Sequence, residues 1–296
     1  GGIAWTHETW NPLRGCSRVS PGCVNCYAER QAMRMSAPGQ AYHGLVQLTS
    51  QGPKWTGGIR LVSDRLMDPA RWTRPRLVFV NSMSDLFHDQ VPDWFIDQVF
   101  AVMAKHPKHT FQVLTKRAER MRNYVSGLTR WARVGSMAEK LGFAIPLPRS
   151  VDDWVPENVW LGVSVEDQQR ADERVPHLLK TRAPLRWISA EPLLGPLRLG
   201  EHGLHGGPGQ IDWVVVGGES GPDARSMEIA WALDLVRDCK AAGVPVFVKQ
   251  LGSNPMHQHS LGNHHQGRLL PVAISDRAGK VMAEWPDELR VQEWPR

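Results

Sequence analysis

The sequence predicts an α/β protein built as a partial or complete (β/α) barrel, with helical and loop insertions. Three observations support this prediction: seven short apolar runs, helical patterns between several of them, and polar side chains directly after the runs. Strand, helix and strand in succession form right-handed βαβ units, which are the usual way to connect neighbouring parallel strands.

The apolar runs are the expected strands. Each is nearly continuous in apolar residues, which is typical of parallel strands that are buried on both faces. They lie at residues 3–6, 76–82, 110–115, 159–165, 184–190, 212–218 and 245–250.

Helical periodicity is clearest at residues 91–107, where apolar residues recur on one face of a helix. Residues 227–243 repeat this pattern and end at Gly243, a typical C-terminal stop. Residues 167–180 are a third expected helix, although Pro176 within this segment is an argument against it.

The barrel is expected to occupy residues 1–251. Two long insertions lie near residues 37–72 and 126–158, where we expect lids or extra helices. Residues 252–296 form a C-terminal extension that we expect to pack on the mouth of the barrel.

The composition is that of an ordinary globular protein, with 42% hydrophobic and 22% charged residues. No run of about 18 apolar residues exists, so no membrane span is expected, and the first residues do not follow the pattern of a signal peptide. Four cysteines, three of them clustered, do not make a secreted disulfide framework, so we expect a cytoplasmic protein. The net charge of +5 allows a nucleic-acid partner.

Polar residues follow the expected strands at their C-terminal ends. In a parallel barrel these ends surround one mouth, where the chemistry of the fold gathers. A carboxylate there can bind an amine or ribose hydroxyls, and a lysine can bind a carboxylate or a phosphate. The simpler alternative is that each strand ends where a polar loop begins. The candidates are Ser84, Asp85, Lys116, Ser164, Glu166, Glu191, Gly218, Glu219, Lys249 and Gln250.

A C-x6-C-x2-C group, formed by Cys16, Cys23 and Cys26, follows the first expected strand and belongs to the same rim. Thiolates suit zinc and iron–sulfur clusters, and Cys26 opens a helix whose N-terminus favours a thiolate. The group is open to three interpretations: ordinary thiols near the core, a zinc site with His7 or His43 as fourth ligand, or a three-cysteine [4Fe–4S] cluster with one open iron. We favour the cluster.

Two further features are given structural interpretations. Cys239 lies in the expected helix at 227–243 and is interpreted as a core residue. A histidine-rich segment at 256–266 could bind a metal, but a polar loop or lid is favoured. Its histidines are His257, His259, His264 and His265.

A three-cysteine loop after the first strand of a (β/α) barrel resembles the radical S-adenosylmethionine (radical SAM) superfamily, whose usual spacing is C-x3-C-x2-C. The chain is also similar to an uncharacterised phage-associated family described as radical-SAM-like. That similarity covers most of the chain and lies in "TWNPLRGC", "SPGCVNCYAER", "FVNSMSDLFHDQVP", "VWLGVSVEDQ", "EPLLGPL", "DWVVVGGESG" and "AGVPVFVKQLG". Spore photoproduct lyase, a radical enzyme that acts on nucleic acid, is a distant analogy at the level of fold.

The resemblance implies a [4Fe–4S] cluster held by Cys16, Cys23 and Cys26, with S-adenosylmethionine chelated by the free iron. An electron donor such as a flavodoxin or ferredoxin would reduce the cluster. Cleavage of a carbon–sulfur bond would then release a 5′-deoxyadenosyl radical, which abstracts a hydrogen atom from the substrate.

The resemblance also suggests roles for the strand-end residues. Ser84 or Asp85 would contact the methionine amine, and Ser164 and Glu166 the methionyl carboxylate or the ribose. Contacts with the adenosyl group or the substrate are assigned to Gly218 and Glu219, and catalytic contacts with the substrate to Lys116, Glu191, Lys249 and Gln250.

The function expected from these arguments is that of a radical SAM enzyme that modifies DNA or RNA. The nucleic-acid partner is suggested by the net charge and by basic residues at strand ends, namely Lys116, Arg117, Arg120, Arg122 and Lys249. One alternative is a zinc-stabilised nucleic-acid-binding protein without catalysis. Another is a barrel hydrolase that uses Glu191 and Glu219 as paired carboxylates.

Overall fold

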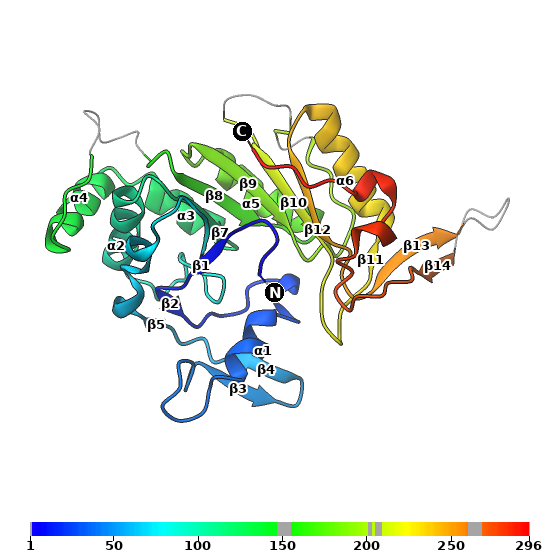
Figure 1. Ribbon diagram of the computed structural model, residues 1–296, viewed down its shortest axis with the longest axis horizontal. Helices are drawn as coiled ribbons and strands as arrows, with labels where there is room; N and C mark the ends of the chain where they lie inside the picture. Colours follow the sequence, from blue (N-terminus) through cyan, green and yellow to red (C-terminus); the bar gives the residue numbers. More distant parts are fainter. Residues whose placement is uncertain (1, 147–154, 201–202, 205–208, 260–267, 296) are drawn as a thin grey trace. The chain divides into compact units, whose positions relative to one another are not determined.

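The computed structural model describes residues 2–146, 155–200, 203–204, 209–259 and 268–295 (Figure 1). The chain divides into two compact units. The first unit comprises Gly1–Val19, Cys26–Val163 and Lys180–Leu185, and the second comprises Ser20–Asn25, Ser164–Leu179 and Arg186–Arg296.

The principal sheet has seven parallel strands, and their order in the sheet follows their order in the chain. This order is that of a partial (β/α) barrel, so the predicted fold class is confirmed. The strands are β1 (Glu8–Trp10), β6 (Leu77–Val80), β7 (Thr110–Thr115), β8 (Val159–Ser164), β9 (Leu185–Ala190), β10 (Trp213–Gly217) and β12 (Val246–Gln250).

The first strand lies later than the sequence predicted. Residues 3–6 form turns and no strand, whereas Thr9 in β1 is paired with Phe79 in β6. The apolar run reflects side-chain burial instead. Trp5 is 2% exposed, and its ring packs edge-on against that of Phe79 with 4.8 Å between the ring centroids. An apolar run of this length cannot by itself distinguish a strand from a buried turn.

In the first unit, the helix predicted at 91–107 is α2, and its predicted inward face, including Phe95 and Val99, is fully buried. The insertion at 37–72 contains short strands, and the insertion at 126–158 contains α4; residues 147–154 lie outside the described residues. The helices are α1 (Tyr27–Met33), α2 (Asp93–Lys105), α3 (Ala118–Val125) and α4 (Arg130–Lys140). The short strands are β2 (Leu13–Arg14), β3 (Val46–Thr49), β4 (Gly52–Trp55) and β5 (Arg60–Leu61).

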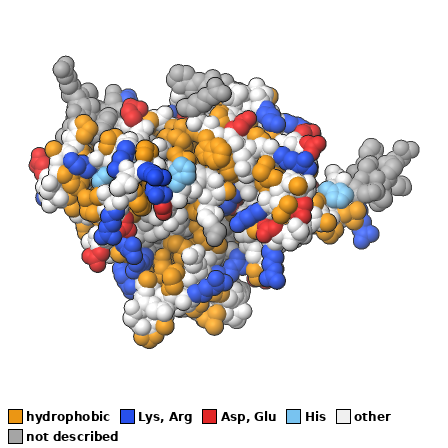
Figure 2. Space-filling model, in the orientation of Figure 1, with side chains coloured by type: hydrophobic (Ala, Val, Ile, Leu, Met, Phe, Trp, Pro, Cys, Tyr) orange, Lys and Arg blue, Asp and Glu red, His pale blue; other side chains and the backbone are white. Residues whose placement is uncertain are grey.

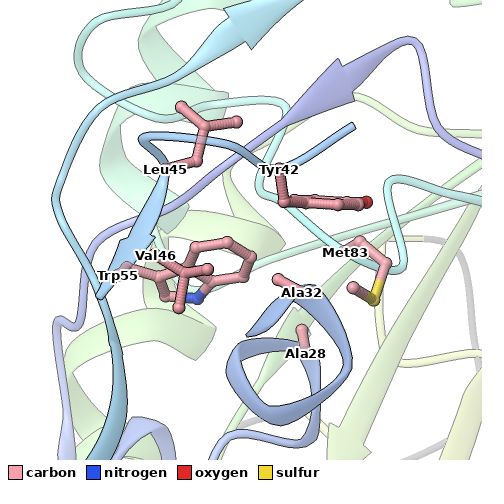
Figure 3. Packing of buried hydrophobic residues seen from close by; sticks show 7 residues of the cluster. All are labelled: Ala28, Ala32, Tyr42, Leu45, Val46, Trp55 and Met83. Atoms are coloured by element: carbon pink, nitrogen blue, oxygen red, sulfur yellow. The ribbon is translucent and has the colours of Figure 1, made fainter. Parts of the chain in front are cut away.

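The insertion at 37–72 packs on the helix that follows Cys26. Ala28 and Ala32 of α1 meet apolar side chains of the β3–β4 hairpin and the turn before it (Figure 3). Cys16 and Cys26 are partly buried and pack against this cluster. The other members of the cluster are Tyr42, Leu45, Val46, Trp55 and Met83.

In the second unit, α5 (Gln168–Leu179) and α6 (Ile229–Ala242) correspond to the other two predicted helices. In Figure 1, α6 lies alongside β10 and β12, and it ends at Gly243 with a left-handed φ of 69°. Cys239 is fully buried in α6, as predicted. No helix among the described residues combines the length and apolar character needed to cross a membrane.

The helix α5 forms in spite of Pro176, which lies within it. A proline removes one backbone hydrogen bond from a helix interior. Ala171, Val175 and Leu178 recur at helical spacing and are fully buried, so apolar burial offsets that loss.

The described part of residues 252–296 belongs to the second unit. A small sheet joins β11 (Met227–Glu228), β13 (Pro255–His259) and β14 (Arg268–Pro271), the last two as an antiparallel hairpin. Near the C-terminus, the Val248 N–H donates to the Val291 carbonyl beside β12. Packing on the barrel mouth stays a prediction, and His264 and His265 lie outside the described residues.

Candidate functional site

The cysteine loop, residues 15–26, begins directly after β2 at Gly15. This glycine has a left-handed φ of 87°, and a Cβ there would lie 3.2 Å from the Ile59 Cα and closer still to the Gly58 carbonyl oxygen. Only glycine fits this position. Gly15 also forms a parallel bridge with Ser84, whose hydroxyl donates to the Leu13 carbonyl at 2.9 Å. The backbone of the first unit thus fixes the start of the loop.

Arg117, after the end of β7, holds the next part of the loop. Its Nη2 donates to Ser17 Oγ at 2.7 Å, and its Nη1 pairs with Asp85 Oδ2 at 3.0 Å. Burial alone would lower the pKa of Arg117, but the Asp85 carboxylate and the Cys16 sulfur raise it above its usual value. A charged guanidinium therefore lies beside Cys16, where positive charge favours a thiolate.

Groups of the protein itself donate hydrogen bonds to the Asp85 carboxylate. Its carboxylate accepts hydrogen bonds from Thr115 Oγ1 (2.7 Å), Arg117 Nη1 (3.0 Å), and the backbone N–H groups of Phe87 (3.0 Å) and Lys116 (3.2 Å). The predicted contact of Asp85 with a methionine amine stays a prediction. Its contacts favour a positioning role, in which Asp85 orients Arg117 toward the cysteine loop.

His88 holds Ser17 from another side. Its Nε2 lies 2.9 Å from Ser17 Oγ, and its Nδ1 accepts the Gln90 N–H at 3.2 Å. Because Nδ1 is an acceptor, the neutral ring carries its proton on Nε2 and donates it to Ser17. Ser17 Oγ thus accepts hydrogen bonds from His88 and from Arg117. A histidine base that activates a serine nucleophile must instead accept the serine proton, so this tautomer of His88 does not suit that role.

In the second unit, the middle of the loop rests on Glu166, which follows β8. Ser20 Oγ donates to Glu166 Oε1, and Arg174 Nη1 pairs with Oε2 at 2.8 Å. Gly22 packs against the same side chain, since a Cβ there would lie 2.7 Å from Glu166 Cδ and closer to Cγ. Glu166 is fully buried and contacts both Ser20 and Gly22, so it supports the loop from inside the protein.

Glu219, after β10, holds the end of the loop within the same unit. Asn25 Nδ2 donates to Glu219 Oε2 at 2.9 Å, and Arg225 pairs with Glu219 at 2.5 Å while donating to the Pro21 carbonyl at 2.9 Å. Burial alone would raise the pKa of Glu219, but hydrogen bonds from Arg225 and Asn25 lower it below its usual value. Glu219 therefore stays ionised, which does not suit a general acid.

Cys26 directly precedes α1, as predicted. In the first turn of α1, Glu29 is 1% exposed and pairs with Arg18 at 2.5 Å. Its Oε1 also accepts the backbone N–H of Trp55 at 2.9 Å. This buried carboxylate connects Arg18 of the cysteine loop to the hairpin that packs on α1.

A second group of predicted residues meets at the ends of β9 and β12. Lys249 Nζ lies 2.6 Å from Glu191 Oε1, and Gln250 Nε2 reaches the same oxygen at 3.4 Å. Ser164 Oγ donates to the Glu191 carbonyl at 3.1 Å, and Gln250 Nε2 to the Gly218 carbonyl at 3.1 Å. Five predicted residues are thus brought together. Because Glu191 is paired with Lys249, and Glu219 with Arg225, the paired-carboxylate hydrolase gains no support.

The thiols differ in accessibility. Cys16, Cys23 and Cys26 are partly exposed, whereas Cys239 is buried and burial raises its pKa to about 12. Among the described residues, no three His, Cys, Asp or Glu side chains converge so as to hold one metal ion. A zinc site with His7 or His43 therefore gains no support. A [4Fe–4S] cluster differs because each thiolate binds a different iron.

Sequence reasoning missed the residues that hold the cysteine loop. The loop side chains are Ser17, Ser20 and Asn25, and the basic partners beyond the loop are Arg117, Arg174 and Arg225. Ser20 and Glu166 are 146 positions apart, and Asn25 and Glu219 are 194 apart. No local pattern marks such pairs, because they depend on which strand ends are brought together.

A family model described as "Protein of unknown function (DUF5131)" matches residues 1–278. No curated protein and no solved structure matches the chain.

Proposed function

The chain belongs to the DUF5131 family, whose function is unknown, and we propose, from the resemblance of its cysteine loop to that of the radical SAM superfamily, that it is a radical SAM enzyme. In this proposal Cys16, Cys23 and Cys26 hold a [4Fe–4S] cluster. The observation that carries the proposal is a cysteine loop held by buried charged residues, three of which follow strands β6, β8 and β10.

The donor set fits such a cluster chemically. The three loop thiols are partly exposed, and Arg117 supplies positive charge beside Cys16. Cys239 is excluded as a ligand because its thiol is buried and its pKa is about 12. Three thiolates leave one of four irons without a cysteine, where the amino and carboxylate groups of S-adenosylmethionine would bind.

When bound, the cluster and S-adenosylmethionine would supply hydrogen-atom abstraction, which ordinary closed-shell side chains do not carry out by themselves. The chain's own residues bind and orient. Asp85, Glu166 and Glu219 support the loop. Ser84 and Gly218 directly precede Asp85 and Glu219 in the sequence, and Ser164 lies two residues before Glu166. Thus the proposal gives the three carboxylates a positioning role in place of direct contact with the cofactor.

The proposed partners are an electron donor, such as a flavodoxin or ferredoxin, and DNA or RNA. The nucleic-acid proposal rests on the net charge of +5. Arg117 and Arg120 no longer support it, since Arg117 binds Asp85 and Arg120 donates to the carbonyls of His88 and Val91. On the face seen in Figure 2, Lys and Arg side chains are interspersed with Asp and Glu.

Anaerobic reconstitution with iron and sulfide tests the proposal. We expect bound iron and sulfide in the wild type, and S-adenosylmethionine should perturb the electron paramagnetic resonance signal of the reduced protein. Cys16→Ala, Cys23→Ala and Cys26→Ala should each lose the cluster, and Cys239→Ala should retain it. Equal iron and sulfide in all five proteins, or zinc in place of iron, would overturn the proposal.

A further inference from the structure

Glu191 and Lys249 form a part-buried ion pair at the ends of two strands of the second unit. Each side chain is 18% exposed, and Glu191 Oε1 lies 2.6 Å from Lys249 Nζ. Exposed ion pairs contribute little to stability, and a pair at the C-terminal ends of parallel strands lies where this fold binds its ligands. Its place and its partial exposure both suit contact with a ligand.

The pair is held in a defined orientation. Gln250 Nε2 spans Glu191 Oε1 and the Gly218 carbonyl, at 3.4 Å and 3.1 Å. A Cβ on Gly217 would lie 3.3 Å from Glu191 Cδ, so the glycine lets the carboxylate lie close to the backbone of β10. Such fixed polar groups are preorganised for hydrogen bonding.

Part of the hydrogen-bonding capacity of the pair is unused in the described part of the chain. Glu191 Oε1 accepts from Lys249 and Gln250, whereas Oε2 has no protein partner there. Among the described residues, Lys249 Nζ has one partner, Glu191, whereas an ammonium group has three donors. The pair therefore offers one acceptor and further donors side by side.

This arrangement selects a particular class of ligand. A phosphate would be attracted by Lys249 but repelled by Glu191, so the pair does not suit a bare anion. A neutral group with a donor and an acceptor side by side, one bonded carbon apart, matches both. The Watson–Crick edge of every nucleobase has this pattern, and enzymes that act on a base read that edge by hydrogen bonds.

We propose that Glu191 and Lys249 bind the Watson–Crick edge of an unpaired nucleobase in the substrate. The inference rests on the proposed function, which makes the nucleic acid a substrate, but the contact with the base needs neither cluster nor cofactor. A peptide amide has a similar donor and acceptor. The positive net charge of the chain favours a nucleic acid over a peptide.

Binding is measured on the full chain without iron or S-adenosylmethionine, so a failed reconstitution does not affect the result. The probes are fluorescently labelled single-stranded DNA and RNA of mixed sequence, matched oligonucleotides with abasic sites, and a neutral peptide of similar length. We expect the base-containing strands to bind at low salt, and the abasic strands to bind about 10- to 100-fold more weakly.

Glu191→Gln and Lys249→Met should each remove most of this difference between base-containing and abasic strands. Glu288→Gln is the matched control, because Glu288 pairs with Arg237 at 2.8 Å on the exposed surface of the same unit and should leave binding unchanged. A Glu191→Lys, Lys249→Glu double variant keeps an ion pair for folding but exchanges donor and acceptor, so it should alter base preference. Urea unfolding of each variant separates loss of binding from loss of fold.

Equal binding of base-containing and abasic strands by the wild type would overturn the inference. So would base-dependent binding that survives both single substitutions, or binding of the peptide alone. Loss of the cluster in the cysteine variants, with base binding retained, would leave both proposals standing. Base binding without any cluster in the wild type would overturn only the radical SAM proposal.

Discussion

Replacing Gly22 with alanine places a methyl group against Glu166, the buried support of the cysteine loop. The added Cβ would lie 2.7 Å from Glu166 Cδ and closer to Cγ, whereas real Cβ atoms essentially never come within 3.0 Å of another heavy atom. Glu166 cannot move aside easily, because it is fully buried and paired with Arg174 at 2.8 Å. Either the loop moves or the ion pair loosens.

The cost follows from these two outcomes. Inserting a methyl group into a packed site costs about 1–3 kcal/mol, and separating a buried ion pair costs about 3–5 kcal/mol. We therefore expect Gly22→Ala to lower the free energy of unfolding by at least about 1 kcal/mol. Gly200→Ala is the matched control, because a Cβ at Gly200 would meet no atom of the described residues within 4 Å. There alanine should be neutral or stabilise by about 0.4–1 kcal/mol.

Urea unfolding followed by circular dichroism measures both variants. A Glu166→Ala background provides a second test, because it removes the atoms that the new methyl group would meet. In that background the penalty of Gly22→Ala should shrink by about 0.5 kcal/mol or more. The reasoning is refuted if Gly22→Ala and Gly200→Ala are equally stable, or if the Gly22→Ala penalty is the same with and without Glu166.

Other predictions concern the neighbouring residues. Asp85→Asn should lower the free energy of unfolding in urea by about 3–5 kcal/mol. Asp89→Asn is the control and should lower it by under about 1 kcal/mol, because Asp89 lies 3.9 Å from the same Arg117 but its side chain is 80% exposed. Equal effects of the two substitutions would contradict this account. Burial, followed by the nearby Arg117, lowers the pKa of His88, so the unfolded chain binds the proton more readily and stability should fall as pH drops below about 6.5. That pH dependence should weaken in His88→Gln, and an unchanged profile would rule out His88 as its source. Iodoacetamide at pH 8 should not label Cys239 in the folded protein, because its thiol is buried and has a pKa of about 12; mass spectrometry showing fast labelling would contradict this.

Much of the fold could be predicted from the sequence, because buried parallel strands and amphipathic helices leave local patterns. The six later apolar runs coincide with strands of the sheet, and α2 and α6 lie where periodicity placed them. The failures also have local causes. Trp5 made a buried turn resemble a strand, and Pro176 made α5 resemble a broken helix although its apolar face is buried.

The strand-end carboxylates were found by sequence reasoning, but their contacts were not. Asp85, Glu166 and Glu219 were expected to face a cofactor, since each follows an apolar run. Each instead pairs with an arginine and supports the cysteine loop. The position of a polar residue after a strand indicates at which end of the sheet it lies. Its hydrogen-bond partners depend on the chain segments that folding brings to that end.

The amino-acid pattern alone was enough to predict the class of the fold and to identify the three clustered thiols, because hydrophobic period and cysteine spacing are properties of neighbouring residues. Which charged side chains are open to a ligand could be seen only in the folded protein. Glu166 and Glu219 are enclosed by Arg174, Arg225 and the cysteine loop, whereas Glu191 keeps one oxygen without a partner in the described chain. The physical reason is that burial and charge pairing act through space, between residues whose separation along the chain carries no pattern.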